Sequence, residues 1–428
     1  MFVKCANTER SLSDIEIREL LCEGLGQLDL TGRRVLVVIP DGTRTAPIGL
    51  LFGLLSDVLG SKVENLDYLI ALGTHPPMDD AAKSKLLGSP VVDGKAGRSR
   101  IFNHRWESPD TFATLGTIPA SEVAAETDGM LEMDIAVRLN RLVGDEDGNA
   151  PYDHILVCGP VFPHEVAGFS GGNKYFVPGV AGQEVIDATH WVGALVTSQS
   201  IIGVRETPVR RLIDRAASFI PTPRSLIALV MHGQNLHGIF MGGMEEAWRA
   251  ATELSAELDI VWVDQPFKRV LSVMPEMYDD IWTGAKGMYK LEPAIADDGE
   301  VVIYAPHITE VSYVHGRYID EVGYHIRDYF TAQWDRFKHI PWGVLAHSTH
   351  LRGGGTFIDG VEKARIRVTL ATGIPRERCE AIGLGYLDPA TVDFSDWEGR
   401  EDEGIVLIPR AGERLYRIKD SDNTSEEE

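Results

Sequence analysis

Short runs of mainly apolar, β-branched residues recur along the chain and alternate with longer amphipathic stretches. Within each run most neighbouring positions are apolar, so neither face of a strand formed there would suit water. Such strands are typical of parallel sheets that helices cover on both sides. The pattern therefore predicts an α/β protein built on mostly parallel, helix-covered sheets. The expected strands cover residues 33–40, 66–73, 154–160, 225–231, 259–264, 269–275 and 300–306.

The apolar pattern breaks at residues 264–268, where Pro266 interrupts a strand-like segment and a new strand, helix, strand unit begins. We expect an N-terminal domain over residues 1–265 and a C-terminal α/β domain over residues 266–418, forming two lobes with an active-site cleft between them. Residues 419–428 are one Lys followed only by Asp, Ser, Asn, Thr and Glu. This composition is too polar to bury and predicts a disordered acidic tail.

The formal net charge is −23, so the chain has no general positive field that would gather phosphate backbones. This argues against nucleic acid as a partner. The longest apolar runs are too short to cross a bilayer, and residues 1–20 contain acidic side chains without a signal-peptide core. We therefore expect a cytoplasmic protein with no membrane partner. The four cysteines form no CxxC pair, which gives no support to a zinc knuckle or a redox dithiol.

Two loops that follow expected strands carry candidate chemistry. In IPDGTRTAP (39–47), a tight Asp-Gly turn would leave Asp41 and Arg44 at the carboxyl end of the sheet, where open α/β sheets bind ligands. In ALGTHPPM (71–78), His75 lies on a proline-stiffened loop. The plainer interpretation is a capping Asp, a solvated Arg and a structural histidine.

The glycine-rich segment 159–182 follows another expected strand and surrounds His164 and Lys174. Glycines allow positive φ and a close approach of backbone N–H groups to a phosphate or carboxylate. The segment is not a Walker A loop, because Asn173 and Tyr175 flank the lysine. Desolvation would lower the pKa of such a lysine amine and make it available for a covalent bond, whereas the plainer interpretation is a cation that grips phosphate.

Further histidines and aromatic residues are weaker candidates. His190, sixteen residues after the lysine, could supply a nitrogen ligand to a late transition metal, although a packed histidine is the commoner case. His347 and His350 form an HxxH without a third ligand, which is little support for zinc. Trp334 is more typical of a helix packing residue than of a substrate platform.

Taken together, these motifs resemble the lactate racemase family in their order and spacing. The long glycine motif is highly specific, and the two shorter motifs support it. The similarity runs from about residue 10 to about residue 385 and weakens beyond residue 265. The resemblance is carried by DGTR (41–44), GTH (73–75), HxxAGFSGGxKxxxPG (164–179) and the following His190.

The resemblance implies a cofactor and an N-terminal domain that binds it. The cofactor is a pyridinium mononucleotide that carries nickel in a sulfur, carbon, sulfur pincer and is joined to Lys174 through a thioamide. His190 matches the protein ligand that completes a near-planar nickel site, a geometry that Ni(II) accepts. Other proteins must synthesise and install this cofactor, so a recombinant preparation is expected to lack it without them. Further cofactor contacts are implied for Asp41, Thr43, Gly171 and Gly172.

The resemblance also implies the reaction, which is racemisation or epimerisation at C2 of a 2-hydroxyacid. Removing a proton from that carbon is difficult because the carboxylate opposes carbanion formation, whereas hydride transfer to a cofactor avoids the carbanion. His75 and His164 would be the acid/base histidines, one on each face of the substrate. Arg44 and Lys286 would supply positive charge to the substrate, with Lys290 as an alternative to Lys286.

The sequence departs from lactate-specific members at one predicted substrate position. Thr283 stands where those members have a glutamine, and residues 307–325 add polar and aromatic groups. We therefore expect a larger or more polar substrate, such as a sugar acid.

Two other functions are compatible with the residues alone. Lys174 could form a Schiff base with a carbonyl compound, or Arg44 and Lys174 could hold an anion in a non-catalytic binding protein.

Overall fold

The computed structural model describes residues 2–419. These residues form two compact units, which we describe separately. Residues 163–168 and 190–204 group with the second unit, although the expected N-terminal domain contains them. The domains 1–265 and 266–418, and the cleft between them, stay predictions. The expected tail lies outside the described residues except for Lys419, whose ammonium group is 2.7 Å from the Asp264 carboxylate. The first unit comprises residues 2–162, 169–189 and 205–258, and the second comprises residues 163–168, 190–204 and 259–419.

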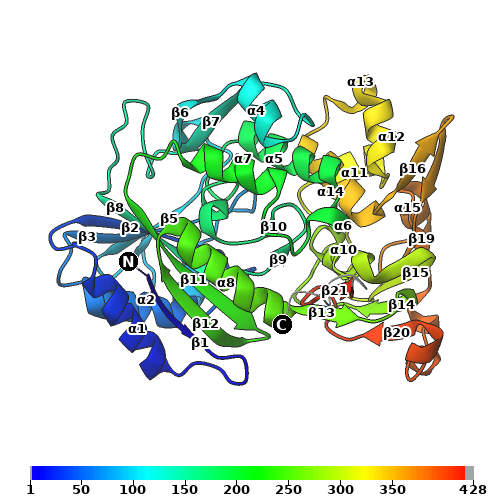
Figure 1. Cartoon of the computed structure of the whole chain (residues 1–428), viewed down its shortest axis with the longest axis horizontal. Helices are drawn as coiled ribbons and strands as arrows, with labels where there is room; N and C mark the ends of the chain where they lie inside the picture. The colour runs from blue at the N-terminus through cyan, green and yellow to red at the C-terminus, as the bar shows by residue number, and fades with distance from the viewer. Residues whose placement is uncertain (1, 420–428) are drawn as a thin grey trace, which may run out of the picture. The chain divides into compact units, whose positions relative to one another are not determined.

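An eight-stranded sheet forms the centre of the first unit (Figure 1). Its order is β1-β12-β11-β8-β2-β3-β5-β4, and the five strands from β11 to β5 run parallel to one another. The three remaining strands extend the two edges in antiparallel pairs. The strands are β1 (Phe2–Ala6), β2 (Arg34–Ile39), β3 (Asn65–Ile70), β4 (Lys95–Ala96), β5 (Ser99–Asn103), β8 (His154–Pro160), β11 (Arg224–His232) and β12 (Asn235–Gly242).

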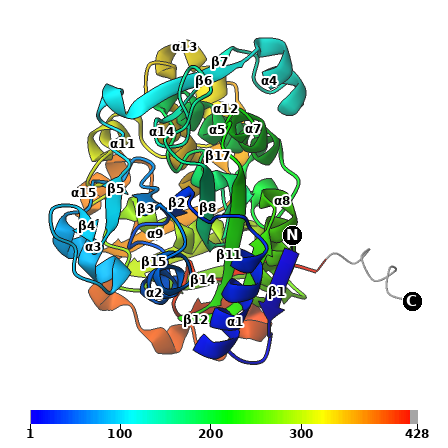
Figure 2. The ribbon, with the colours of Figure 1, turned by 90° about the vertical axis from the view of Figure 1, so that its left-hand side faces the viewer.

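Helices cover both faces of this sheet (Figures 1 and 2). A Cβ atom at Gly24 of α1 would lie 2.5 Å from Met241 of β12, and one at Gly238 of β12 would lie 2.3 Å from Leu254 of α8. Met241 and Gly238 are three residues apart on one strand, so α1 and α8 pack on opposite faces. A separate hairpin joins β6 (Phe112–Ile118) and β7 (Ile135–Asn140). The helices are α1 (Asp14–Gly26), α2 (Ile48–Leu59), α3 (Asp80–Leu87), α4 (Ala120–Glu126), α5 (Gln183–Val196), α7 (Pro208–Ala217) and α8 (Met244–Asp259).

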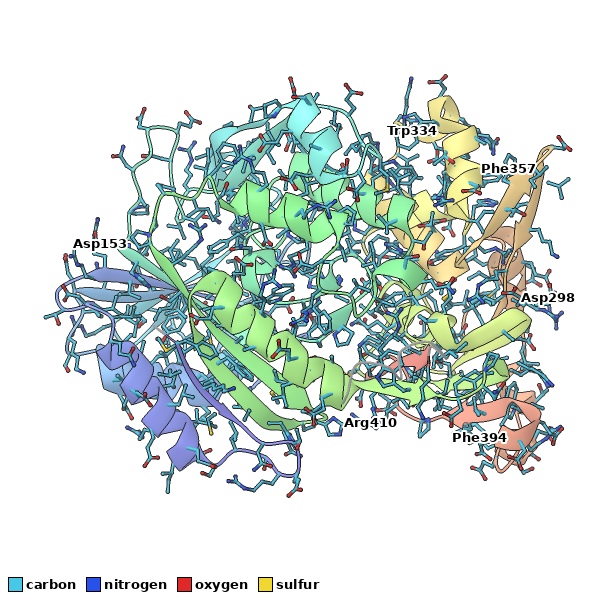
Figure 3. All side chains as sticks on the ribbon, in the orientation of Figure 1. Asp153, Asp298, Trp334, Phe357, Phe394 and Arg410 are labelled. Carbon is cyan, nitrogen blue, oxygen red and sulfur yellow. The ribbon has the colours of Figure 1, made fainter. Side chains whose placement is uncertain are left out.

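The second unit contains a five-stranded sheet, β19-β18-β15-β14-β20, in which all neighbouring strands are parallel. Figure 3 shows Phe357 on a separate antiparallel hairpin, β16–β17, and its ring lies 5.3 Å from that of Tyr329. The strands are β9 (Pro163–His164), β10 (Gly168–Phe169), β13 (Ile260–Val263), β14 (Phe267–Val273), β15 (Ile295–Ala305), β16 (Gly355–Ile358), β17 (Val361–Ala364), β18 (Arg367–Thr372), β19 (Gly385–Tyr386), β20 (Ile405–Ile408) and β21 (Leu415–Ile418).

Short helices surround the sheet of the second unit (Figure 1). Several are capped or broken by proline or glycine, as at α14, which begins after Pro341 and ends before Gly353. The helices are α6 (Ser198–Ile201), α9 (Ile281–Gly284), α10 (Lys286–Tyr289), α11 (Gly316–Val322), α12 (Arg327–Ala332), α13 (Trp334–Phe337), α14 (Trp342–Arg352) and α15 (Arg376–Ala381).

The fold class predicted from the apolar pattern is confirmed. Each of the seven expected strands overlaps an observed strand, and both larger sheets are mainly or wholly parallel. The strand expected over residues 66–73 ends at Ile70, because the chain turns at Gly73, which has φ +56°. Within residues 2–419, no helix is long and apolar enough to cross a membrane.

The buried core predicts a stability effect that can be measured. Leu229 of β11 is fully buried in the core between the sheet and α1, α2 and α3. We expect Leu229→Ala to lower the free energy of unfolding by roughly 2–5 kcal/mol, because it removes buried methyl groups and leaves a cavity. Urea unfolding followed by circular dichroism measures this change. The matched variant Val92→Ala, at a side chain 67% exposed, should change it by less than about 0.5 kcal/mol.

Candidate functional site

The first cluster of candidate side chains lies where β2 ends. Asp41 is buried and accepts hydrogen bonds from the backbone N–H and the hydroxyl of Thr43, at 3.1 and 2.6 Å. His75, in the loop after β3, has its Nδ1 atom 2.5 Å from the other oxygen of the same carboxylate. Because β2 and β3 are parallel neighbours, their carboxyl ends meet at one edge of the sheet. The structure therefore brings three predicted residues together.

The Asp41 carboxyl is held in its charged form. Burial by itself raises its pKa, but the hydrogen bond and charge of His75, helped by Arg44 and Thr43, hold the pKa well below its ordinary value. Arg44 is half-buried, and its Nη1 atom donates to the Thr43 hydroxyl at 3.2 Å. A fixed negative charge thus orients the imidazole, and a guanidinium lies in the same network.

The loop that carries His75 is fixed by backbone hydrogen bonds. The N–H of His75 donates to the Leu72 carbonyl at 2.9 Å, and the indole N–H of Trp106 donates to the His75 carbonyl at 3.0 Å. The N–H of Gly73 donates to the carbonyl of Gly179 at 2.9 Å, which joins this loop to the glycine-rich loop. No motif marks Trp106, so the sequence analysis missed it.

The glycine-rich loop follows β8 and contains a short 3-10 turn, η2 (Gly172–Tyr175). Lys174 lies in this turn with a half-buried side chain, and its backbone N–H donates to the Gly171 carbonyl at 3.2 Å. Gly171 and Gly172 have φ of +78° and +60°, a region that other residues rarely adopt. The backbone at the lysine therefore depends on glycine at both positions.

Tyr175 is a further residue of this site that the sequence analysis did not select. A Cβ atom at Gly159 would lie 1.8 Å from the Tyr175 hydroxyl, so the tyrosine packs directly on the end of β8. Burial raises the pKa of the Tyr175 phenol well above its ordinary value, and the charges of Arg44 and Asp41 also act on it. The glycine at the end of a buried strand was the only sequence signal that could have indicated it.

The remaining predicted residues divide between the units. His164 is buried in the second unit, and its Nδ1 atom accepts a hydrogen bond from the Val166 N–H at 3.1 Å. This hydrogen bond assigns the proton of the neutral His164 ring to Nε2. His190, half-buried, lies on α5 where the second unit begins. Asp41, Thr43, Arg44, His75, Gly171, Gly172 and Lys174 belong to the first unit, and His164, His190 and Lys286 to the second.

The two candidate lysines of the second unit have different surroundings. Lys290 is buried, and its ammonium group donates to the carbonyl of Glu413 at 3.1 Å. Lys286 is half-buried, and its ammonium group lies 4.7 Å from the centre of the Tyr278 ring. The buried ammonium group of Lys290 therefore has a structural hydrogen bond, whereas that of Lys286 packs over an aromatic ring.

The segment around Lys286 also carries the departure from lactate-specific members. The Thr283 hydroxyl donates to the Asp280 carboxylate at 2.9 Å, and the same carboxylate caps α9 by accepting from the Thr283 N–H. The neighbouring Trp282 stacks with His347 at 3.9 Å and packs against His315 at 4.5 Å between ring centres. Asp280 therefore caps α9 and binds the Thr283 hydroxyl, while the neighbouring Trp282 packs between two imidazole rings.

The HxxH pair on α14 has no metal-site geometry. Burial lowers the pKa of His347 well below its ordinary value and that of His350 to about 4, so both rings are neutral. No group of three or more His, Cys, Asp or Glu side chains within residues 2–419 could hold a metal ion. Trp334, labelled in Figure 3, stacks on Trp191 at 4.9 Å and contacts Trp342 at 5.3 Å, as a packing residue does.

Comparisons with known proteins agree with this arrangement. A family model described as the lactate racemase N-terminal domain matches residues 16–203. A lactate racemase of Thermoanaerobacterium thermosaccharolyticum is 25% identical over 279 residues, which are 64% of this chain and 60% of that protein. The match therefore spans less than two thirds of that relative's length.

Solved structures share the fold. The crystal structure of a protein from Thermotoga maritima matches with a TM-score of 0.86 and 32% identity, over 97% of this chain and 100% of that one. The lactate racemase apoprotein from Thermoanaerobacterium thermosaccharolyticum matches with a TM-score of 0.71 and 19% identity, over 96% of this chain and 94% of that one. The protein has the α/β fold of that apoprotein. Over residues 16–203 the chain is similar to the N-terminal domain of the lactate racemase family.

The charged Asp41 predicts a pH dependence of stability. Its folded pKa lies below the unfolded value of about 3.9, so its stabilising contribution is fully present above that pH and is lost as the pH falls below it. We expect the unfolding free energies of wild type and Asp41→Asn to differ most above about pH 5 and to approach each other progressively as the pH falls below about 4 toward the folded pKa. Urea unfolding at several pH values measures this difference.

The control for this prediction is Asp57→Asn, which removes an exposed carboxylate paired with Arg18. This variant should differ little from wild type at any pH, because exposed ion pairs contribute little. A gap between wild type and Asp41→Asn that widens toward acid would contradict the assignment of a charged, paired carboxylate.

Proposed function

We propose that the protein is a nickel-dependent racemase or epimerase that inverts C2 of a 2-hydroxyacid, with Lys174 as the attachment point of a nickel-pincer nucleotide. One observation carries the proposal. The Asp41–His75 pair and the Lys174 loop form one hydrogen-bonded assembly in the first unit, joined by the Gly73 N–H and the Gly179 carbonyl at 2.9 Å. An oriented imidazole next to an anchoring lysine is what acid/base chemistry on a tethered cofactor requires.

The residues present fit the proposed cofactor. The half-buried lysine would provide the amine for the covalent bond, and Gly171 and Gly172 have the positive φ that lets a backbone approach an anion. His190 would provide an imidazole ligand to nickel, a metal that imidazole suits. When bound, the nucleotide supplies a hydride acceptor and donor for the C2 carbon. Asp41 and Thr43 would complete the cofactor's surroundings in the first unit.

We propose that His75 and His164 are the two acid/base residues. The Asp41 carboxylate lies 2.5 Å from Nδ1 of His75 and orients that ring. Nδ1 of His164 lies 3.1 Å from the Val166 nitrogen and 3.4 Å from the Glu165 carboxylate, so it can accept from the N–H in the neutral ring or donate to the carboxylate in the imidazolium. One histidine removes the proton of the C2 hydroxyl and the other, as an imidazolium, returns a proton, with the roles exchanged in the reverse direction.

A substrate carboxylate needs positive charge. Arg44 lies in the Asp41 network, and the ammonium group of Lys286 lies 4.7 Å from the centre of the Tyr278 ring. Arginine offers a planar fork to a carboxylate, and lysine a compact point charge. We propose that these two side chains bind the carboxylate and the oxygen on C2.

We further propose a substrate larger and more polar than lactate, such as a polyhydroxy or sugar acid. The Thr283 hydroxyl is bonded to Asp280, and the ring of Trp282, the preceding residue, packs against the ring of His315. Aromatic faces pack against C–H groups while imidazole nitrogens form hydrogen bonds, a combination that suits a polyhydroxyl chain. Enzymes that synthesise and install the cofactor are the partners that this proposal requires.

The attachment at Lys174 is tested by intact mass spectrometry. Protein produced with the cofactor-building enzymes should carry an adduct and about one nickel per chain, whereas Lys174→Ala should carry no adduct and lose turnover by more than about 10³-fold. Lys95→Ala, at an exposed lysine, is the matched control and should retain both the adduct and the turnover.

Two outcomes would replace this proposal with another function. Borohydride trapping of a carbonyl compound on Lys174 in fully active, nickel-free protein would identify a Schiff-base enzyme. The protein would be identified as a binding protein by two results together. A ligand would bind Lys174→Ala only slightly more weakly than it binds the wild type, and the wild type would show no turnover under any loading condition.

The substrate class is tested with a panel of 2-hydroxyacids on the nickel-loaded enzyme. We expect kcat/KM for six-carbon polyhydroxy acids to exceed that for lactate by about tenfold or more, because each added hydroxyl finds a polar partner. Exchange of the C2 configuration, followed by chiral chromatography, measures it. Turnover of lactate alone would contradict the larger substrate and leave the cofactor assignment intact.

A further inference from the structure

Three consecutive carbonyl groups of the glycine-rich loop accept hydrogen bonds from two side chains elsewhere in the first unit. Arg210 of α7 donates through Nη2 to the Phe169 carbonyl and through Nη1 to the Gly171 carbonyl at 3.4 Å. Trp248 of α8 donates through its indole N–H to the Ser170 carbonyl at 2.9 Å. These contacts hold the carbonyls of residues 169–171 on one side of the loop.

Arg210 and Trp248 form a single buried contact. The guanidinium carbon of Arg210 lies 4.1 Å from the centre of the Trp248 ring, and Arg210 is only 2% exposed. Burying a guanidinium without partners is costly, and burial lowers the pKa of Arg210 to about 10. The loop carbonyls and the indole face are what compensate this charge, since the nearest carboxylate, that of Asp214, is 4.0 Å away.

The direction of the carbonyls determines the direction of the N–H groups. In an extended strand successive carbonyls alternate, so three on one side require a departure from extended geometry, and Gly171, between the second and third carbonyls, has φ +78°. Across a trans peptide the N–H points opposite to the preceding carbonyl. The N–H groups of residues 170–172 therefore point away from Arg210 and Trp248.

These N–H groups differ in their partners. The N–H of Ser170 donates to the Phe162 carbonyl at 2.8 Å. The N–H groups of Gly171 and Gly172 donate to no acceptor among residues 2–419, although both glycines are buried. Buried N–H groups are almost always paired in native proteins, and consecutive N–H groups that point the same way bind anions.

Trp248 also restricts the loop sterically. A Cβ atom at Gly172 would lie 3.0 Å from Cδ1 of Trp248, and one at Gly171 would lie 2.5 Å from the Val161 side chain. The two glycines are therefore packed against the residues behind them, and the loop cannot relax toward α8. The contacts with Arg210 and Trp248 therefore determine both the position of the loop and the direction of its N–H groups.

We propose that Arg210 and Trp248 are positioning residues that turn the N–H groups of Gly171 and Gly172 outward to bind a phosphomonoester. This inference rests on the proposed function, because the phosphate that it assigns to the loop is that of the nucleotide attached to Lys174. Neither side chain touches the nucleotide; both act through the backbone of the loop.

The test compares two ligands that differ only in phosphate. Nicotinamide mononucleotide and nicotinamide riboside are titrated by calorimetry into the full-length chain purified without cofactor. Wild type should bind the mononucleotide about tenfold or more tightly than the riboside, and inorganic phosphate should compete. Trp248→Phe, which keeps a ring but removes the donor, should reduce that ratio about threefold to tenfold, and Arg210→Lys should remove the preference.

Controls separate positioning from folding. Arg249→Lys, on the same helix as Trp248 but with a side chain 41% exposed, should leave the ratio unchanged. Because Arg210→Lys can lose stability, circular dichroism and the melting temperature are recorded for each variant. If the melting temperature of Trp248→Phe is unchanged, the affinity ratio of that variant alone decides the test. A ratio in Trp248→Phe equal to that of wild type overturns the inference.

The failure of this inference is distinguishable from failure of the proposed function. Equal affinity of wild type for mononucleotide and riboside overturns anion binding by the loop, even where mass spectrometry finds the Lys174 adduct. A missing adduct and missing nickel after loading overturn the proposed function, whatever the phosphate titrations give. Reduced adduct formation on Trp248→Phe, with normal formation on Arg249→Lys, supports both.

Discussion

The conformation of the glycine-rich loop is the constraint on which the candidate site of the first unit depends. Its carbonyls are held by Arg210 and Trp248, and its glycines adopt positive φ. From this conformation follow the position of Lys174, the outward direction of two N–H groups and the hydrogen bond to the loop of His75. A single side chain with a Cβ atom at Gly171 would disturb all three, because the space behind it is filled.

The histidines have different electrostatic surroundings. Nδ1 of His75 faces the buried, charged Asp41, whereas Nδ1 of His164 accepts from a backbone N–H. Burial lowers the pKa of both His347 and His350, and the charge of Glu165 opposes this shift at His350. The proposed roles of His75 and His164 depend on these differences in what the ring nitrogens contact.

Similarity to the lactate racemase family and the local chemistry support the proposal by separate routes. The family model covers residues 16–203, the part of the chain that contains the oriented His75, the glycine loop and Lys174. The segment around Lys286 and Trp282 lies beyond that range, where substrate preference is expected to vary. The substrate proposal consequently depends on the contacts of the second unit rather than on the family.

The apolar runs by themselves determined the fold class, because a strand that is buried on both faces needs apolar side chains at adjacent positions. The glycine motif likewise determined where Lys174 would lie, since positive φ and close backbone approach are local demands. Trp106, Tyr175, Arg210 and Trp248 were not predictable, because each acts on a partner distant in the chain. Only the tertiary structure decided their contacts, as it did the different surroundings of Lys286 and Lys290. Hydrogen-bond direction and burial depend on which segments pack together, and no local pattern of residues contains that information.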